Sequence, residues 1–165
     1  MRTGWMSLAA VALAAMVSTA HAQKRERVVG SWIVTHEADP FDGKTKVVAV
    51  ATTFGGSYAM AVRCLDNGVS VALFDRKATM KEGDVFEVRF RADQMPIVTT
   101  YGMALDDSML EITEADEIVK QMASATQAAF RIENKRGVQN TAVFRMRSAK
   151  AAMGDVLKAC SDTHQ

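Results

Sequence analysis

Residues 57–74 (SYAMAVRCLDNGVSVALF) constrain the fold most, because they contain a β-hairpin whose register can be predicted from the sequence. Asn67-Gly68 favours a two-residue type I′ turn, since both central residues of that turn need a positive φ. Such a turn places Cys64 opposite Val71 and Val62 opposite Leu73. Both pairs are apolar and share one face, so the turn and the period-two pattern predict the same register. Arg63 then lies on the opposite face.

The first 22 residues predict a secretory signal peptide. Arg2 precedes an apolar run over residues 6–17, and Ala20-His21-Ala22 is a small-x-small cleavage site. We expect cleavage between Ala22 and Gln23, which leaves residues 23–165 as one exported domain. The apolar run is shorter than the roughly 18 residues of a membrane-spanning helix, so we expect no stable membrane insertion after cleavage. The alternative is an uncleaved anchor. The predicted location is the periplasm, with secretion from the cell as the alternative.

The mature chain is electrically balanced. Cleavage removes one basic residue, Arg2, and leaves 19 basic and 19 acidic residues. Non-specific binding to nucleic acid depends on a large positive charge that neutralises phosphates. The balance therefore argues against a nucleic-acid partner.

Alternating residues predict a β-rich domain. In residues 84–91, Phe86, Val88 and Phe90 alternate with charged residues, which is typical of a half-buried antiparallel strand. Further strands are expected at residues 27–35, 44–53, 97–105, 109–112, 128–133 and 138–147, with a turn at residues 39–43. We expect an α+β fold with a mostly antiparallel sheet or sandwich of about seven to nine strands.

Two helices complete this prediction, one inserted late and one C-terminal. Thr113-Glu114-Ala115-Asp116 resembles a capping box, so a helix is expected from there to about residue 127. Ser148 is expected to cap the final helix. The apolar residues of that helix recur at helical spacing and place Cys160 on the buried side.

Cys64 and Cys160 are the only cysteines. In an exported chain, two cysteines that both face inward predict one disulfide. The alternative is a redox or nucleophilic cysteine. It lacks support, because the chain has neither a Cys-x-x-Cys motif nor an arrangement that indicates an activating base.

The sequence carries no catalytic or metal-binding motif that we can identify. After cleavage only His36 and His164 remain, too few for a histidine-based metal site. The acidic pairs Asp106-Asp107 and Asp116-Glu117 fall in a turn and at a helix start, where acidic residues are common. We therefore expect a non-enzymatic protein without a cofactor or a metal ion.

Basic residues recur on the predicted outward side of the strands. Two interpretations stay open: they keep the sheet soluble, or some of them form a patch for an acidic partner or an anionic polymer. The patch requires Arg63 and Arg89 to share one face of the sheet with few carboxylates between them. The candidate partner-binding residues are Arg63, Arg89 and Arg91, and the other outward arginines are Arg131, Arg145 and Arg147.

Several short motifs in this chain resemble the VasI family, also called TagO, of small exported proteins associated with type VI secretion. The motifs are Trp32, the Asp39-Pro40-x-Asp42 turn, Arg63-Cys64, Arg89-Phe90-Arg91 with Asp93, and the late Cys160. The resemblance implies the same disulfide and a role beside a secretion apparatus. At Ser148 the family pattern would have a glycine.

Two functional hypotheses follow from these residues. The first is a periplasmic accessory or binding protein whose partner is an envelope or secretion-apparatus protein. The alternative is a small periplasmic inhibitor or ligand-binding module unrelated to secretion. An enzyme ranks third, because the sequence offers no catalytic constellation.

Overall fold

The computed structural model describes residues 24–38, 43–66, 68–133 and 139–163. The predicted signal peptide, its cleavage site at Ala22 and Gln23, the turn at residues 39–42 and His164 lie outside these ranges.

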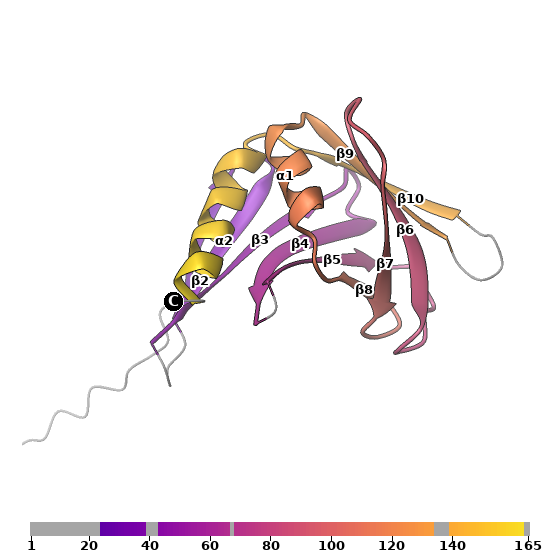
Figure 1. Cartoon of the computed structure of the whole chain (residues 1–165), viewed down its shortest axis with the longest axis horizontal. Coiled ribbons are helices and arrows are strands. Elements are labelled where there is room, and N and C mark those ends of the chain that lie inside the picture. Colours follow the sequence, from indigo (N-terminus) through magenta and orange to yellow (C-terminus); the bar gives the residue numbers. More distant parts are fainter. Residues whose placement is uncertain (1–23, 39–42, 67, 134–138, 164–165) are drawn as a thin grey trace, which may run out of the picture.

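The described chain forms one ten-stranded antiparallel sheet and two helices (Figure 1). The strand order is β1-β2-β3-β4-β5-β8-β7-β6-β9-β10. The helices are α1 (Asp116–Ser124) and α2 (Ala149–Thr163). The strands are β1 (Lys24–Val29), β2 (Trp32–Ala38), β3 (Thr45–Thr52), β4 (Tyr58–Leu65), β5 (Gly68–Asp75), β6 (Val85–Ala92), β7 (Val98–Ala104), β8 (Met109–Ile112), β9 (Gln127–Glu133) and β10 (Gln139–Arg145).

The predicted α+β class, the inserted helix and the C-terminal helix are confirmed, but the sheet has one strand more than the expected maximum. The segment predicted as a single strand at residues 27–35 is a hairpin of β1 and β2. Gly30 has a φ of +64° and reverses the chain, so that Val29 pairs with Trp32. Apolar residues lie on both sides of Gly30, so the sequence pattern does not reveal this turn.

The hairpin of β4 and β5 forms, but its predicted register is wrong by two residues. Cys64 pairs with Val69 and Val62 with Val71, and the described pairing closes at Leu65 and Gly68. Gly68 adopts its positive φ of +118° as the first residue of β5. A shift of two residues leaves every side chain on the same face, so burial of apolar residues does not distinguish the two registers.

The sheet is strongly curved, and α2 packs on its concave side (Figure 1). Helix α2 contacts β2, β3 and β4, and α1 contacts α2 and β5. Between the elements lies a core of fully buried aromatic residues. The Phe90 and Phe130 ring centroids are 4.9 Å apart, and Phe144 meets Phe130 edge-on at 6.1 Å. The outward residues Glu87, Arg89 and Arg91 of β6 are charged and exposed, which explains the alternation seen in the sequence.

The two ends of the sheet meet at the turn between β1 and β2. The Ser31 amide donates to the Arg147 carbonyl at 3.1 Å, and the Ser31 hydroxyl donates to the Arg145 carbonyl at 2.6 Å. A Cβ atom on Gly30 would lie 2.3 Å from the Arg147 carbonyl oxygen. The curvature of the sheet therefore depends on a close backbone approach that glycine permits.

Asp93 connects the end of β6 to the start of β9. Its carboxylate accepts hydrogen bonds from the Thr126 amide at 2.8 Å, the Thr126 hydroxyl at 2.9 Å and the Gln127 amide at 3.0 Å. These hydrogen bonds, those from Thr126 first, lower the pKa of Asp93 below its usual value. The aspartate of the Arg-Phe-Arg motif thus has a structural role.

Both predicted helix caps are wrong. Helix α1 follows Ala115 without a side-chain cap, because Glu114 has a φ of +56°, outside the geometry of a capping box. It ends at Ser124, short of residue 127. Ser148 has a φ of +63°, whereas a capping serine is extended. This left-handed conformation suits the glycine that the family pattern has at that position.

Candidate functional site

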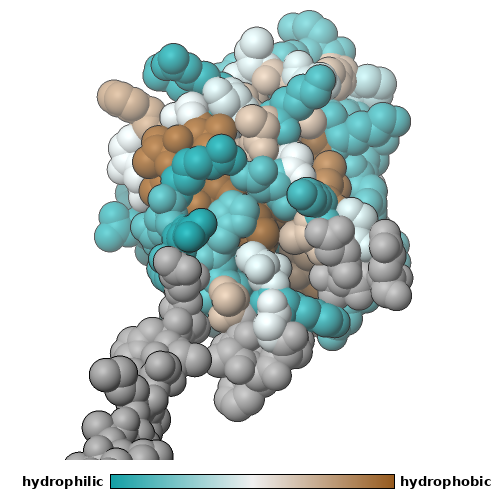
Figure 2. All heavy atoms as spheres, turned by 90° about the vertical axis from the view of Figure 1, so that its left-hand side faces the viewer, coloured by the Kyte–Doolittle hydropathy of each residue, from teal (hydrophilic) through white to brown (hydrophobic). Residues whose placement is uncertain are grey.

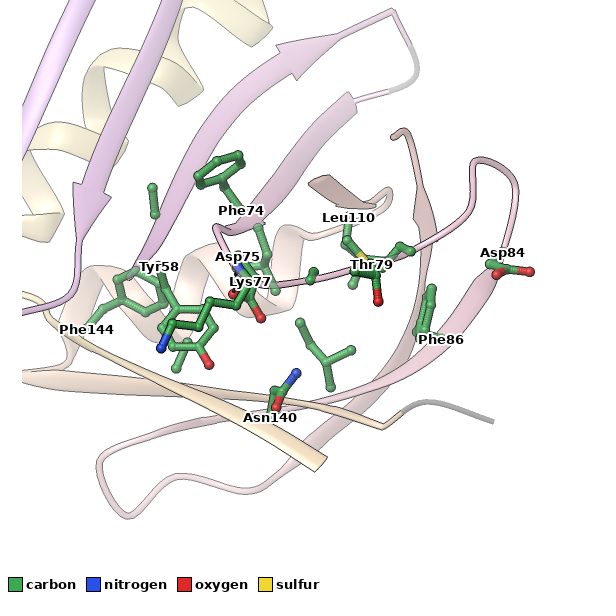
Figure 3. A pocket seen from close by; sticks show the side chains of 16 residues that line it. Tyr58, Phe74, Asp75, Lys77, Thr79, Asp84, Phe86, Leu110, Asn140 and Phe144 are labelled. Atoms are coloured by element: carbon green, nitrogen blue, oxygen red, sulfur yellow. Dashed lines mark hydrogen bonds between the residues drawn. The ribbon is translucent and has the colours of Figure 1, made fainter. Parts of the chain in front are cut away.

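A cavity of about 420 Å³ lies inside the curve of the sheet, and we call it the sheet pocket (Figure 3). Its lining residues come from β4, β5, β6, β8, β9, β10 and the loop between β5 and β6. Neither helix contributes to the described lining. Its volume falls within the range of about 300–1,000 Å³ that is common for small-molecule sites.

Apolar side chains line both ends of the sheet pocket. Phe86 and Leu110 lie at one end, and Phe144 of β10 lies at the other end beside Tyr58 (Figure 3). Ile132 of β9 also belongs to the lining. Leu110 and Phe144 are fully buried and belong to the core. The core therefore forms part of the wall of the sheet pocket.

Polar groups also line the sheet pocket, several of them at the end where Phe144 lies. Tyr58 and Asp75 pair directly across β4 and β5, and Lys77 and Asn140 approach the same space (Figure 3). The Asp75 carboxylate accepts the Lys77 amide at 2.9 Å, and this aspartate is only 7% exposed. Burial, followed by the negative charge of Asp75, raises the pKa of Tyr58.

The loop between β5 and β6 is held in place by backbone hydrogen bonds. The Arg76 amide donates to the Ser57 carbonyl at 3.2 Å, and the Met80 amide donates to the Asp107 carbonyl at 3.0 Å. These contacts fix Lys77 and Thr79 beside the sheet pocket. The rim is thus preorganised, which lowers the entropic cost of binding.

Sequence reasoning missed the sheet pocket, because its lining is assembled from six strands and a polar loop. One signal was available. Val71, Leu73 and Asp75 share the inward face of β5, so the alternation that predicts burial of the first two residues also predicts burial of the carboxylate.

The predicted disulfide between Cys64 and Cys160 is confirmed. It joins β4 to α2 across a Cα–Cα distance of 5.3 Å, and the described chain contains no free cysteine. Cys160 is buried, as the helical spacing predicted.

Arg63 does not join an arginine patch. Its guanidinium pairs with Glu111 on β8, and the Ser70 hydroxyl donates to the same carboxylate oxygen at 3.1 Å. Strands β5, β8 and β7 separate Arg63 from Arg89. Three strands and the Glu111 carboxylate on β8 therefore lie between the two arginines.

Arg89 lies instead opposite Arg131, across β6 and β9. Both are exposed, and Arg131 also donates to the Thr141 hydroxyl at 3.4 Å. Arg91, on the same strand as Arg89, donates to Gln94 at 3.0 Å. Arg145 and Arg147 are exposed but lie near the opposite end of β10.

The side of the molecule that carries α2 is mostly hydrophilic (Figure 2). Its hydrophobic areas are interrupted by polar side chains, and Arg27 of β1 pairs there with Asp155 of α2. Across the described ranges, no helix has the length and apolar character needed to cross a membrane. Those ranges also contain no cluster of three or more residues that could hold a metal ion.

Comparisons with known proteins identify the fold. No family model and no curated protein matches the chain. The crystal structure of invasion associated protein B from Bartonella henselae matches with a TM-score of 0.58 at 13% identity, over 84% of this chain and 98% of that one. The likeness shows a shared fold.

Proposed function

We propose that this protein is a non-enzymatic binding protein of the periplasm that holds a ligand in the sheet pocket. The observation that carries the proposal is the pocket itself, whose lining combines buried apolar side chains with the polar side chains of Tyr58, Asp75, Lys77 and Asn140. In ligand sites, placed polar groups of this kind fix the orientation of the bound molecule. The proposal therefore favours the ligand-binding module, which the sequence analysis gave as the alternative hypothesis.

Two features support export to the periplasm. The first 22 residues have the charge and apolar pattern of a cleaved signal peptide. The disulfide between Cys64 and Cys160 suits an oxidising compartment.

A binding role is supported by the chemistry of the lining. Its polar side chains, among them Tyr58, Asp75 and Asn140, can orient a ligand whose apolar part contacts the buried side chains.

The finer proposal is an accessory role beside a type VI secretion apparatus. It rests on the resemblance to the VasI family, whose Arg-Cys motif and late cysteine are the residues of the disulfide here. Arg89 and Arg131 are the arginines positioned to meet an acidic envelope protein. Secretion-apparatus genes beside this gene would support that role, and their absence would leave the binding module alone.

The test compares two tryptophan substitutions at neighbouring residues of β10. Asn140→Trp fills the sheet pocket, because Asn140 points into it (Figure 3), whereas Thr141→Trp adds the same bulk on the opposite face. Both residues are exposed, so we expect both variants to fold. Each protein is purified from the periplasm without denaturation, extracted with organic solvent and analysed by mass spectrometry.

We expect the wild type and Thr141→Trp to carry a small molecule that Asn140→Trp lacks. Circular dichroism melting curves confirm that the variants are folded. The same small-molecule content in all three proteins, or no bound compound in any of them, would contradict the proposed function.

A further inference from the structure

Asp75 has fewer partners than a buried carboxylate normally has. It is 7% exposed, and its side chain receives one described hydrogen bond, from the Lys77 amide. No described lysine, arginine or histidine forms an ion pair with it. Burial of a carboxylate is costly unless charged or hydrogen-bonding groups compensate it. Asp75 is also a lining residue of the sheet pocket, so a ligand there can use the rest of its hydrogen-bonding capacity.

The surroundings of Asp75 favour a cation. Tyr58 stands directly across from it, and the Phe144 and Phe86 rings line the same sheet pocket (Figure 3). Aromatic faces attract ammonium groups, and a carboxylate hydrogen-bonds them strongly when water is excluded. An anionic group at this position would be repelled by the negative charge of Asp75.

Two other charged groups line the sheet pocket. Lys77 extends alongside Tyr58 (Figure 3), but this residue is exposed, so solvent and salt screen its charge. The Asp84 carboxylate lies at the far side, directed away from Tyr58 and Asp75 (Figure 3). Among the described lining residues, the one charged side chain that is buried is thus negative.

We propose that the ligand of the sheet pocket carries an ammonium group on an apolar body. The ammonium donates hydrogen bonds to Asp75, and the apolar body lies against Phe86, Leu110 and Phe144. This inference rests on the proposed function, because it names the chemical class of the ligand for the same pocket.

The test uses three probes with one phenylbutyl body and different head groups: phenylbutylamine, phenylbutanol and phenylbutanoate. Isothermal titration calorimetry of the wild-type protein at neutral pH gives the affinity of each. We expect the amine to bind at least about tenfold more tightly than the alcohol, because its charge strengthens the hydrogen bond to Asp75. We expect the carboxylate to bind most weakly.

Three variants test whether the preference for the amine depends on contact with Asp75. Asp75→Asn keeps an oxygen to accept the Lys77 amide but removes the charge, so amine affinity should fall at least about tenfold while alcohol affinity stays unchanged. Lys77→Gln should raise amine affinity by about twofold to threefold, because it removes a screened repulsion. Glu82→Gln makes the same charge change as Asp75→Asn at an exposed residue of the same loop, outside the lining, and should have no effect.

Equal affinities for the three probes, or tightest binding of the carboxylate, would overturn the ammonium assignment and leave the sheet pocket as a binding site. An equal loss in Asp75→Asn and Glu82→Gln would overturn it too, since the effect would then not depend on contact with Asp75. If Asp75→Asn does not fold, the probe series on the wild type decides alone. Binding of none of the probes overturns the ammonium class, whereas the Asn140→Trp comparison separately decides whether the pocket binds a ligand.

Discussion

Reduction of the disulfide should lower the free energy of unfolding by about 4 kcal/mol, because the bond closes a loop between residues 96 positions apart. The bond also holds α2 against β4, where Cys160 packs among the buried residues of the helix. For a domain of this size the melting temperature should fall by more than about 10 °C. Thermal unfolding with and without a reductant measures the change.

The control for this prediction is a thiol titration of protein purified from the periplasm. The structure predicts no free thiol among the described residues before reduction and two after it. Two titratable thiols in the untreated protein would contradict the account, as would a dimer linked through its cysteines.

Gly30→Ala should destabilise the fold by about 3 kcal/mol, from two additive causes. The φ of +64° is a left-handed conformation that costs a residue with a Cβ atom about 1–2 kcal/mol. The new Cβ atom would also lie 2.3 Å from the Arg147 carbonyl oxygen, so β10 and the β1–β2 turn would have to separate. Urea unfolding monitored by tryptophan fluorescence reports the change, since Trp32 is fully buried beside this turn.

Gly56→Ala is the matched control. Gly56 has a φ of +67°, nearly that of Gly30, but a Cβ atom added to it would meet no neighbouring atom within 4 Å. It should therefore show only the backbone cost of about 1–2 kcal/mol. Equal destabilisation by the two substitutions would mean that the close approach between Gly30 and Arg147 does not matter.

Local patterns in this sequence predicted local features well. The alternation of Phe86, Val88 and Phe90 depends only on which face of a strand is buried, and these residues are all in the core. The disulfide was also predictable, because two inward cysteines in an exported chain have few other outcomes. In the β4–β5 hairpin, the sequence predicted correctly which residues share a face but not their register, since a shift of two residues leaves every side chain on the same face.

Features that depend on the curvature of the sheet were not predictable. Arg63 lies on the outward face of β4, as its place in the alternation predicted, but β8 brings Glu111 across β5 to pair with it. The sheet pocket exists because β10 curves back toward β4, which places Asn140 and Tyr58 around one cavity. Neither contact can be predicted from the spacing of residues in the sequence. Glu114 and Ser148 show the same limit for caps, because their left-handed backbone depends on how the helices are placed.

The measurement that tests the central claim most directly is a chemical-shift map of the isotope-labelled mature protein, titrated with small molecules extracted from the periplasm. We predict that the amide shifts concentrate around Tyr58, at residues 73–80 and at Asn140, where the lining residues of the sheet pocket lie. Thr141→Trp should show the same shifts, and Asn140→Trp should lose them. Shifts confined to the outer face around Arg89 and Arg131, or no shifts at the sheet pocket, would contradict the account.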